Sequence, residues 1–150
     1  MNCDIDLATN VAARLSLYKF KDIEFFTQKL IIPGIRAVYP KIQAPRLAVA
    51  MPPQSIVYEP FVLTYLLKED MSNHKSLINW LQDAITEKGE NVFSDASVFI
   101  LSAQRTVVSE IKFLGMMPID ISGIEYVTTA DTTVYQQATV TFDYLQYKYV

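Results

Sequence analysis

The sequence is poor in the two residue types on which disulfides and most metal sites depend. Of its 150 residues, one is cysteine, Cys3, and one is histidine, His74. A single cysteine cannot form a disulfide within the chain. One histidine and one distant cysteine do not supply the closely spaced ligands of a zinc site. We therefore expect no bound metal and a protein that is made in a reducing cytoplasm.

Glycine is also scarce, and its scarcity argues against nucleotide chemistry. The four glycines are scattered along the chain, whereas phosphate-binding loops need several close together. A Ser-His-Asp triad would have to use His74, which falls in the first turn of a predicted helix and is better explained there as an exposed or capping residue. The adjacent acids Glu69 and Asp70 precede the same helix and suit its positive end. We predict that the protein is not an enzyme and uses no cofactor.

Excess positive charge and a long apolar run are both missing. The formal net charge is −3, so the sequence lacks the basic character of a protein that grips nucleic acid tightly. No apolar run reaches the roughly 20 residues that span a bilayer. Residues 1–6 do not combine a basic region with an apolar run, so we expect no secretory signal and no membrane partner.

The residues that are abundant favour β-structure. Half of the residues are apolar, with nine tyrosines and eight phenylalanines, and such residues are enriched in strands. A chain of this length can bury one core. We expect a single domain over residues 1–150, a mainly β sandwich or barrel of two packed sheets with one flanking α-helix. Residues 1–14 are expected to be a mobile or partner-bound end.

The clearest local pattern runs from Tyr58 to Leu81. Residues 61–67 alternate like a strand, with Pro60 at its start, where a missing N–H costs least. Polar residues 68–73 then break the strand and offer side-chain caps for a helix. An apolar stripe follows at helical spacing, formed by Leu77, Ile78, Leu81, Ala84 and Ile85, with Trp80 beside it. The corner and the helix packing are predicted to depend on Asp70, Asn73, Leu77, Trp80 and Leu81.

Other strands are predicted from shorter patterns, at residues 15–20, 25–32, 96–103, 106–114 and 138–145. Between them, prolines at 40, 45, 52 and 53 interrupt an aliphatic segment, which favours an irregular loop or a long edge hairpin with arms at 46–51 and 54–67. Because this segment is apolar yet exposed by its prolines, it is our candidate for a loop that reaches a neighbouring subunit or ring. The assembly residues proposed in it are Arg46, Val49, Met51, Pro52 and Pro53.

Several of these stretches, in order, resemble the contractile-phage tail tube proteins. The sequence EDMSN at 69–73, followed by LINWL at 77–81, is similar to that family's strand-to-helix corner. FLGMMPIDIS at 113–122 resembles its strand, kink and Pro-polar-serine step. GIEY at 123–126, a polar loop and ATVTFDY at 138–144 resemble its closing strand. LIIPG at 30–34 is similar to an early Leu-Pro-Gly turn. The resemblance covers roughly residues 58–147.

The resemblance implies a fold and an assembly. Two packed sheets flanked by a helix would form the subunit, six copies would close a ring around a channel, and rings would stack into a tube. The type VI secretion tube protein shares this architecture. The implied partners are further copies of the chain, the sheath protein, baseplate and tail terminator proteins, and DNA that passes through the lumen without specific binding. The implied location is the tail of a phage virion.

Two alternatives stay open. The same fold also builds the tube-initiating ring of the baseplate, so a tube-initiator subunit is the first. The second, from another class, is a small monomeric β-barrel that binds an apolar ligand in an internal cavity. The strand at 61–66 is apolar on both faces, which favours a sheet covered by a partner over a monomer.

Overall fold

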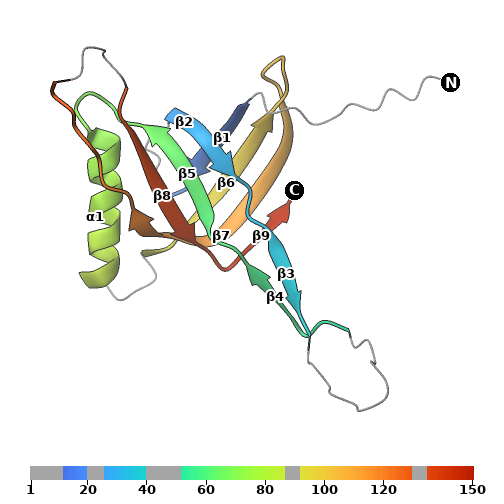
Figure 1. Ribbon diagram of the computed structural model, residues 1–150. Coiled ribbons are helices and arrows are strands. Elements are labelled where there is room, and N and C mark those ends of the chain that lie inside the picture. Colours follow the sequence, from blue (N-terminus) through green and yellow to red (C-terminus); the bar gives the residue numbers. More distant parts are fainter. Residues whose placement is uncertain (1–11, 20–25, 40–51, 87–91, 130–134) are drawn as a thin grey trace.

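The computed structural model describes residues 12–19, 26–39, 52–86, 92–129 and 135–150. These residues form nine strands and one helix (Figure 1). In chain order the elements are β1 Ala12–Leu17, β2 Phe26–Ile31, β3 Ile35–Val38, β4 Ser55–Tyr58, β5 Phe61–Leu66, α1 Ser72–Thr86, β6 Ser94–Leu101, β7 Val107–Ile121, β8 Gln137–Asp143 and β9 Gln146–Tyr149.

Seven strands form one antiparallel sheet that is folded over at β7. The hydrogen-bonded order is β1-β6-β7-β8-β5-β2, and β9 pairs with β7 as well. The first part of β7 pairs with β6 and β9, whereas Met117–Ile121 pairs with β8. The change of partner follows Gly115, whose φ of +64° is unfavourable for other residues. A Cβ at Gly115 would also lie 3.0 Å from the Leu145 side chain.

The inner faces of the two halves of this sheet meet in one core rich in aromatic rings. The ring centroids of Phe61 in β5 and Phe113 in β7 are 5.0 Å apart, and Phe142 in β8 lies 6.1 Å from Phe61. Such pairs stabilise a fold by about 0.5–1.5 kcal/mol beyond their area burial. The alternation predicted for β5 and β8 is confirmed, because their inward positions are buried and those between them are half-buried or exposed. The buried set is Phe61, Leu63, Tyr65, Ala138, Val140 and Phe142.

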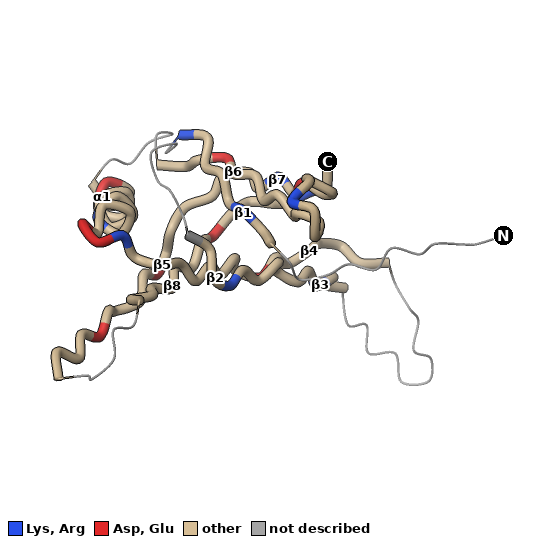
Figure 2. Tube along the Cα trace, turned by 90° about the horizontal axis from the view of Figure 1, so that it is seen from above, with Lys and Arg blue, Asp and Glu red and all other residues tan. Residues whose placement is uncertain are grey.

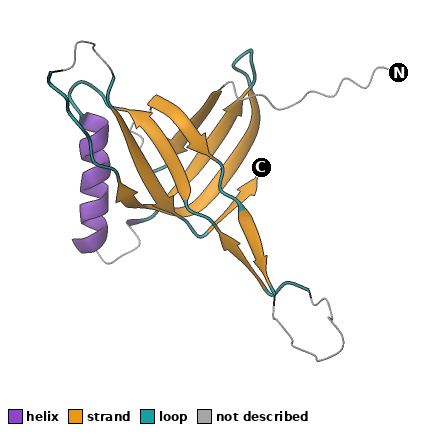
Figure 3. Ribbon diagram, in the orientation of Figure 1, coloured by secondary structure: helices purple, strands orange, loops and turns teal. Residues whose placement is uncertain are grey.

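The helix α1 runs alongside β8 and covers one side of this core (Figure 3). The Trp80 ring lies 5.9 Å from Phe142, and its indole N–H donates to the Val92 carbonyl at 2.7 Å. Leu77 is fully buried beside it. The predicted apolar stripe is wrong at its end, because Ile85 is 72% exposed. One turn of helix extends past the part of the core that it covers.

The mainly β fold with one flanking helix is confirmed, and several boundaries differ from the sequence prediction. The first strand is Ala12–Leu17, so it begins three residues before the strand predicted at 15–20 and includes three residues of the end expected at 1–14; residues 1–11 lie outside the described ranges. The strand predicted at 106–114 continues to Ile121. The strand predicted at 138–145 ends at Asp143, and β9 follows after a tight bend.

Candidate assembly surface

The strands β3 and β4 form a separate two-stranded ribbon that projects away from the body (Figure 1). They pair antiparallel, with Ile35 opposite Tyr58 and Val38 opposite Ser55. The ribbon continues the line of β2 and β5, from which it is separated by Pro33-Gly34 on one side and Glu59-Pro60 on the other. Both joints contain a proline, which removes a backbone donor and ends the pairing of the main sheet there.

Large apolar side chains are exposed on both faces of the ribbon. Ile35 and Ile56 point to one face and are more than half exposed. Val38 and Val57 point to the other face and are each more than 40% exposed. Within the described residues, β3 and β4 pair only with each other, so their outer edges have no strand partner. A two-stranded ribbon is marginal alone in water, and exposed apolar edges mark interaction sites.

The root of the ribbon is fastened to the body by two tyrosine hydroxyls. Tyr144 donates to the Glu59 carbonyl at 2.7 Å, and Tyr147 donates to the Pro33 carbonyl at 2.8 Å. The chain is therefore held at Pro33, just before β3 begins, and at Glu59, just after β4 ends. Between the strands, the Glu59 N–H donates to the Gly34 carbonyl at 3.1 Å.

Aromatic packing reinforces this anchor. The Tyr58 ring, at the base of β4, meets Tyr144 and Tyr147 edge-on, with centroids 5.8 and 5.6 Å away. Phe113 lies 5.0 Å from Tyr144 and joins the anchor to the core. Burial raises the pKa of both Tyr144 and Tyr147, so the two hydroxyls keep their protons and remain donors well above neutral pH. We call these four groups, Tyr58, Tyr144, Tyr147 and Phe113, the root anchor.

The structure reaches only part of the assembly segment proposed from the sequence. Pro52 and Pro53 are exposed and lead into β4. Arg46, Val49 and Met51 lie outside the described residues. The strand that pairs with β4 is β3, whereas sequence reasoning had sought that arm at residues 46–51. Both β3 and the root anchor were missed; the available signal for β3 was the short stretch Ile-Arg-Ala-Val at 35–38, bounded by Pro33-Gly34 and Pro40.

The residues predicted for the corner and the helix lie together near β5. Asp70 is exposed, and its side chain accepts from the Ser72 N–H, the first N–H of the helix. This hydrogen bond lowers the pKa of Asp70. Asn73 is buried; its amide donates to the Leu66 carbonyl, and its oxygen accepts from the Lys68 N–H. In the helix, Leu77 and Trp80 are buried and Leu81 is half-buried.

His74 does not take the exposed or capping role that the sequence suggested. It is half-buried, and its Nδ1 lies 3.0 Å from the Tyr65 hydroxyl. Burial lowers the pKa of His74, so the neutral ring is favoured and can accept from that hydroxyl. Across the described ranges, no group of three or more metal-ligating side chains is gathered that could hold an ion. The helix in the described residues is not long and apolar enough to cross a membrane.

Solved structures with the same fold come from contractile injection machines. No protein-family model matches the sequence, and no curated protein sequence matches it. A chain of the anti-feeding prophage baseplate matches with a TM-score of 0.67 and 6% identity, over 96% of this chain and 97% of that one. A chain of an extracellular contractile injection system, from its PVC sheath-tube complex, matches with a TM-score of 0.56 and 12% identity, over 92% of this chain and 88% of that one. A crystal structure of an Hcp protein matches with a TM-score of 0.55 and 16% identity, over 86% of this chain and 72% of that one.

These likenesses define a class of fold. The chain has the fold that contractile tail tubes, their baseplates and type VI secretion proteins share, as the sequence resemblance predicted. Sequence identities this low support a shared fold alone, so the function has to be argued from the surface of the chain. The surface feature to explain is an apolar ribbon that is firmly anchored at its root and uncovered along its length.

Proposed function

We propose that the chain is a structural subunit of a contractile tail tube. In this proposal six copies close a ring, rings stack into a tube inside a sheath, and the tube is the conduit for DNA in a phage tail. The observation that carries the proposal is the exposed ribbon, since both of its faces expose large apolar side chains that nothing in the described chain covers. In a tube built from one kind of subunit, the partner that covers the ribbon is a further copy of the chain.

The ends of the main sheet support assembly by identical copies. β1 and β2 stand at the two ends of the hydrogen-bonded order, and each pairs with a single described strand. β1 and β2 also contact each other within the subunit without pairing, so we propose that the parts of their edges outside this contact pair with a neighbouring subunit. A ring closed in this way has no free edge left, which favours a closed assembly over open aggregation.

The face of β5 and β8 turned away from the core suits a DNA conduit. On these two strands it carries Val62, Thr64, Thr139 and Thr141, which are uncharged; on the flanking strands, Lys29 of β2 lies opposite Thr64 and Asp120 of β7 lies opposite Thr141. Thr64 and Thr139 lie opposite each other with their hydroxyl oxygens 3.2 Å apart. A lumen lined with many cations would bind phosphates, whereas a hydroxyl-rich surface on which one lysine is balanced by one aspartate lets DNA pass without specific binding. We propose that this face lines the channel.

A tube-initiator subunit of the baseplate is the second candidate. The observation that favours it is the baseplate chain of the anti-feeding prophage, which matches over nearly the full length of both chains. A monomeric ligand-binding barrel is disfavoured because aromatic rings fill the core between the two halves of the sheet.

Size-exclusion chromatography followed by negative-stain imaging of the purified protein tests the proposal. A tube subunit gives rings of one defined symmetry that stack into tubes. An initiator gives rings that do not elongate alone. A compact monomer at high protein concentration would contradict both. Met51→Asp is expected to block tube growth while leaving the monomer folded, and normal tubes from that variant would remove Met51 from the assembly segment.

A further inference from the structure

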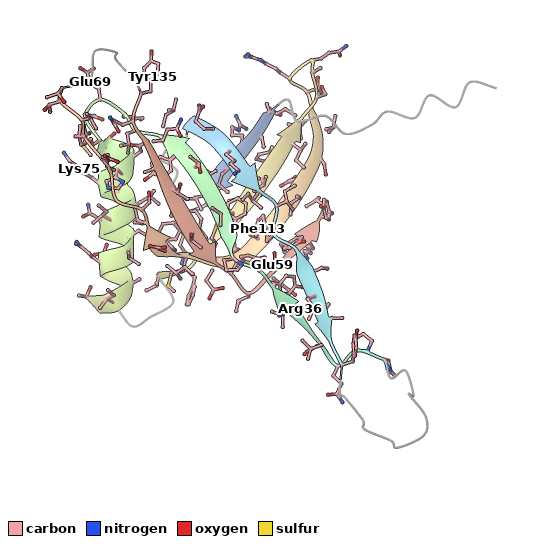
Figure 4. All side chains as sticks on the ribbon, viewed as in Figure 1. Arg36, Glu59, Glu69, Lys75, Phe113 and Tyr135 are labelled. Atoms are coloured by element: carbon pink, nitrogen blue, oxygen red, sulfur yellow. The ribbon has the colours of Figure 1, made fainter. Side chains whose placement is uncertain are left out.

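The end of the molecule opposite the ribbon carries a second exposed surface, built from three chain segments. The Leu67 N–H donates to the Gln136 carbonyl at 2.9 Å, which brings Tyr135 beside the end of β5. The Tyr126 hydroxyl lies 3.6 Å from the Met71 sulfur, which brings the loop after β7 to the same corner. Figure 4 shows Glu69 and Tyr135 at this end and Arg36 on the ribbon at the far end.

This surface combines exposed rings with exposed acids. Tyr135 is 82% exposed and Tyr126 is 59% exposed. Glu69, Asp70 and Glu125 are exposed around them. We call these five residues the aromatic-acidic corner. Seen from above in Figure 2, the helix side of the molecule that bears the corner lies opposite the ribbon.

The ribbon has the complementary chemistry. Arg36 is exposed and shares one face of the ribbon with Val38 and Val57. In the described part of the chain, neither Arg36 nor Glu69 is joined to another residue by an ion pair. A guanidinium can pair with a carboxylate and stack on a tyrosine ring at the same time. The valines beside it offer the apolar area that exposed tyrosines pack against.

We propose that the aromatic-acidic corner of one copy receives the β3–β4 ribbon of a copy in the next ring. Arg36 of the incoming ribbon pairs with Glu69 and Glu125, while Val38 and Val57 cover the tyrosines. The two surfaces differ from each other and lie at opposite ends of the subunit, so the contact is heterologous and repeats from ring to ring. The inference rests on the proposed tube function and names the acceptor surface within it.

Charge-reversal variants and the variant that combines them test this contact, and the total tube mass is measured from negative-stain images. Arg36→Glu alone, or Glu69→Arg together with Glu125→Arg, is expected to reduce tube mass at least tenfold while rings persist. The variant that carries all three changes is expected to recover tube mass to within about threefold of wild type. Asp70 is left in place because it caps α1. Arg105→Glu, an exposed charge in the turn after β6, is the matched control and should elongate normally.

The outcomes separate this inference from the proposed function. If the wild-type protein forms neither rings nor tubes, the proposed function fails. If the wild type elongates and Arg36→Glu elongates equally, the ribbon's charge has no role and the inference is wrong. If both charge-reversed variants stop at rings and the combined variant also stops there, the two surfaces do not meet and the inference is again wrong. Rings from every variant show that the subunits are folded.

Discussion

The body and the ribbon use similar apolar residues in opposite ways. In the body, the aromatic rings of β5, β7 and β8 are fully buried and contact one another. In the ribbon, isoleucines and valines of β3 and β4 are exposed on both faces. The body therefore holds buried area that supports the fold of the single chain, and the ribbon holds apolar area that no described residue of the chain buries. The root anchor connects the two, so that an interaction element is held by a stable core.

The largest loss of stability is expected when the largest buried ring of the body, that of Trp80, is removed. Trp80→Ala should lower the free energy of unfolding by about 3–5 kcal/mol, because a buried indole and its hydrogen bond to Val92 are lost together. Chemical denaturation measures this. Ile85→Ala, on the exposed end of the same helix, should change it by less than about 0.5 kcal/mol. If Trp80→Ala lowered the free energy of unfolding by less than about 1 kcal/mol, the result would contradict the placement of Trp80 in the core.

The reverse effect is expected in the ribbon. Val57→Asp should abolish tubes while changing the free energy of unfolding by less than about 1 kcal/mol, since this side chain is exposed in the single chain. Negative stain and chemical denaturation of the same sample give both readouts. Val108→Asp is the matched control, because Val108 is an exposed valine on a strand of the body. Tubes from Val57→Asp, or equal loss from both variants, would contradict a special role for the ribbon.

The root anchor should show an intermediate effect. Tyr144→Phe and Tyr147→Phe each delete one hydrogen bond to the ribbon root and keep the ring, so each should cost about 1 kcal/mol. Together they should shorten tubes, because the ribbon is no longer held in one direction. Tyr149→Phe is the control, since Tyr149 is exposed and its hydroxyl makes no hydrogen bond in the described chain. Full-length tubes from the double variant would show that the ribbon needs no anchor.

A further test of the body uses pH. Burial raises the pKa of Tyr65 to about 12, whereas an unfolded tyrosine ionises near 10. The stability that the neutral Tyr65 contributes is therefore complete below pH 10 and is lost as pH rises toward 12. Denaturation curves between pH 9 and 12 should show this decline, and Tyr65→Phe should make it shallower. An identical decline in Tyr65→Phe would show that the group that titrates is another residue.

Sequence reasoning found the parts of the fold whose burial follows a simple period. β5 and β8 alternate between core and surface, and the buried positions of α1 fall at helical spacing, so their residue patterns show which side faces the core. The kink at Gly115 hid the length of β7, because the strand continues after changing its partner. β9 was missed since its four residues are only half-buried or exposed and carry no alternation.

The candidate assembly surface was harder to predict for a physical reason. A ribbon that is apolar on both faces has neither the alternation of a half-buried strand nor the length of a buried one. Of the exposed apolar segment predicted at 46–53 from its prolines, the structure describes only Pro52 and Pro53, while the partner strand β3 and the tyrosines of the anchor come from distant parts of the chain. Contacts such as that between Tyr147 and Pro33 depend on the tertiary fold and leave no local signal.

Hydrogen–deuterium exchange of the ribbon amides, compared between assembled and unassembled protein, tests the central claim most directly. The claim predicts that the outward-facing amides of Ile35–Val38 and Ser55–Tyr58 exchange quickly in dissociated subunits and become at least tenfold more protected in the assembled state. The amides of β5 and β8 should be protected in both. Equal exchange of the ribbon in the two states would show that no neighbouring copy covers it and would contradict the account.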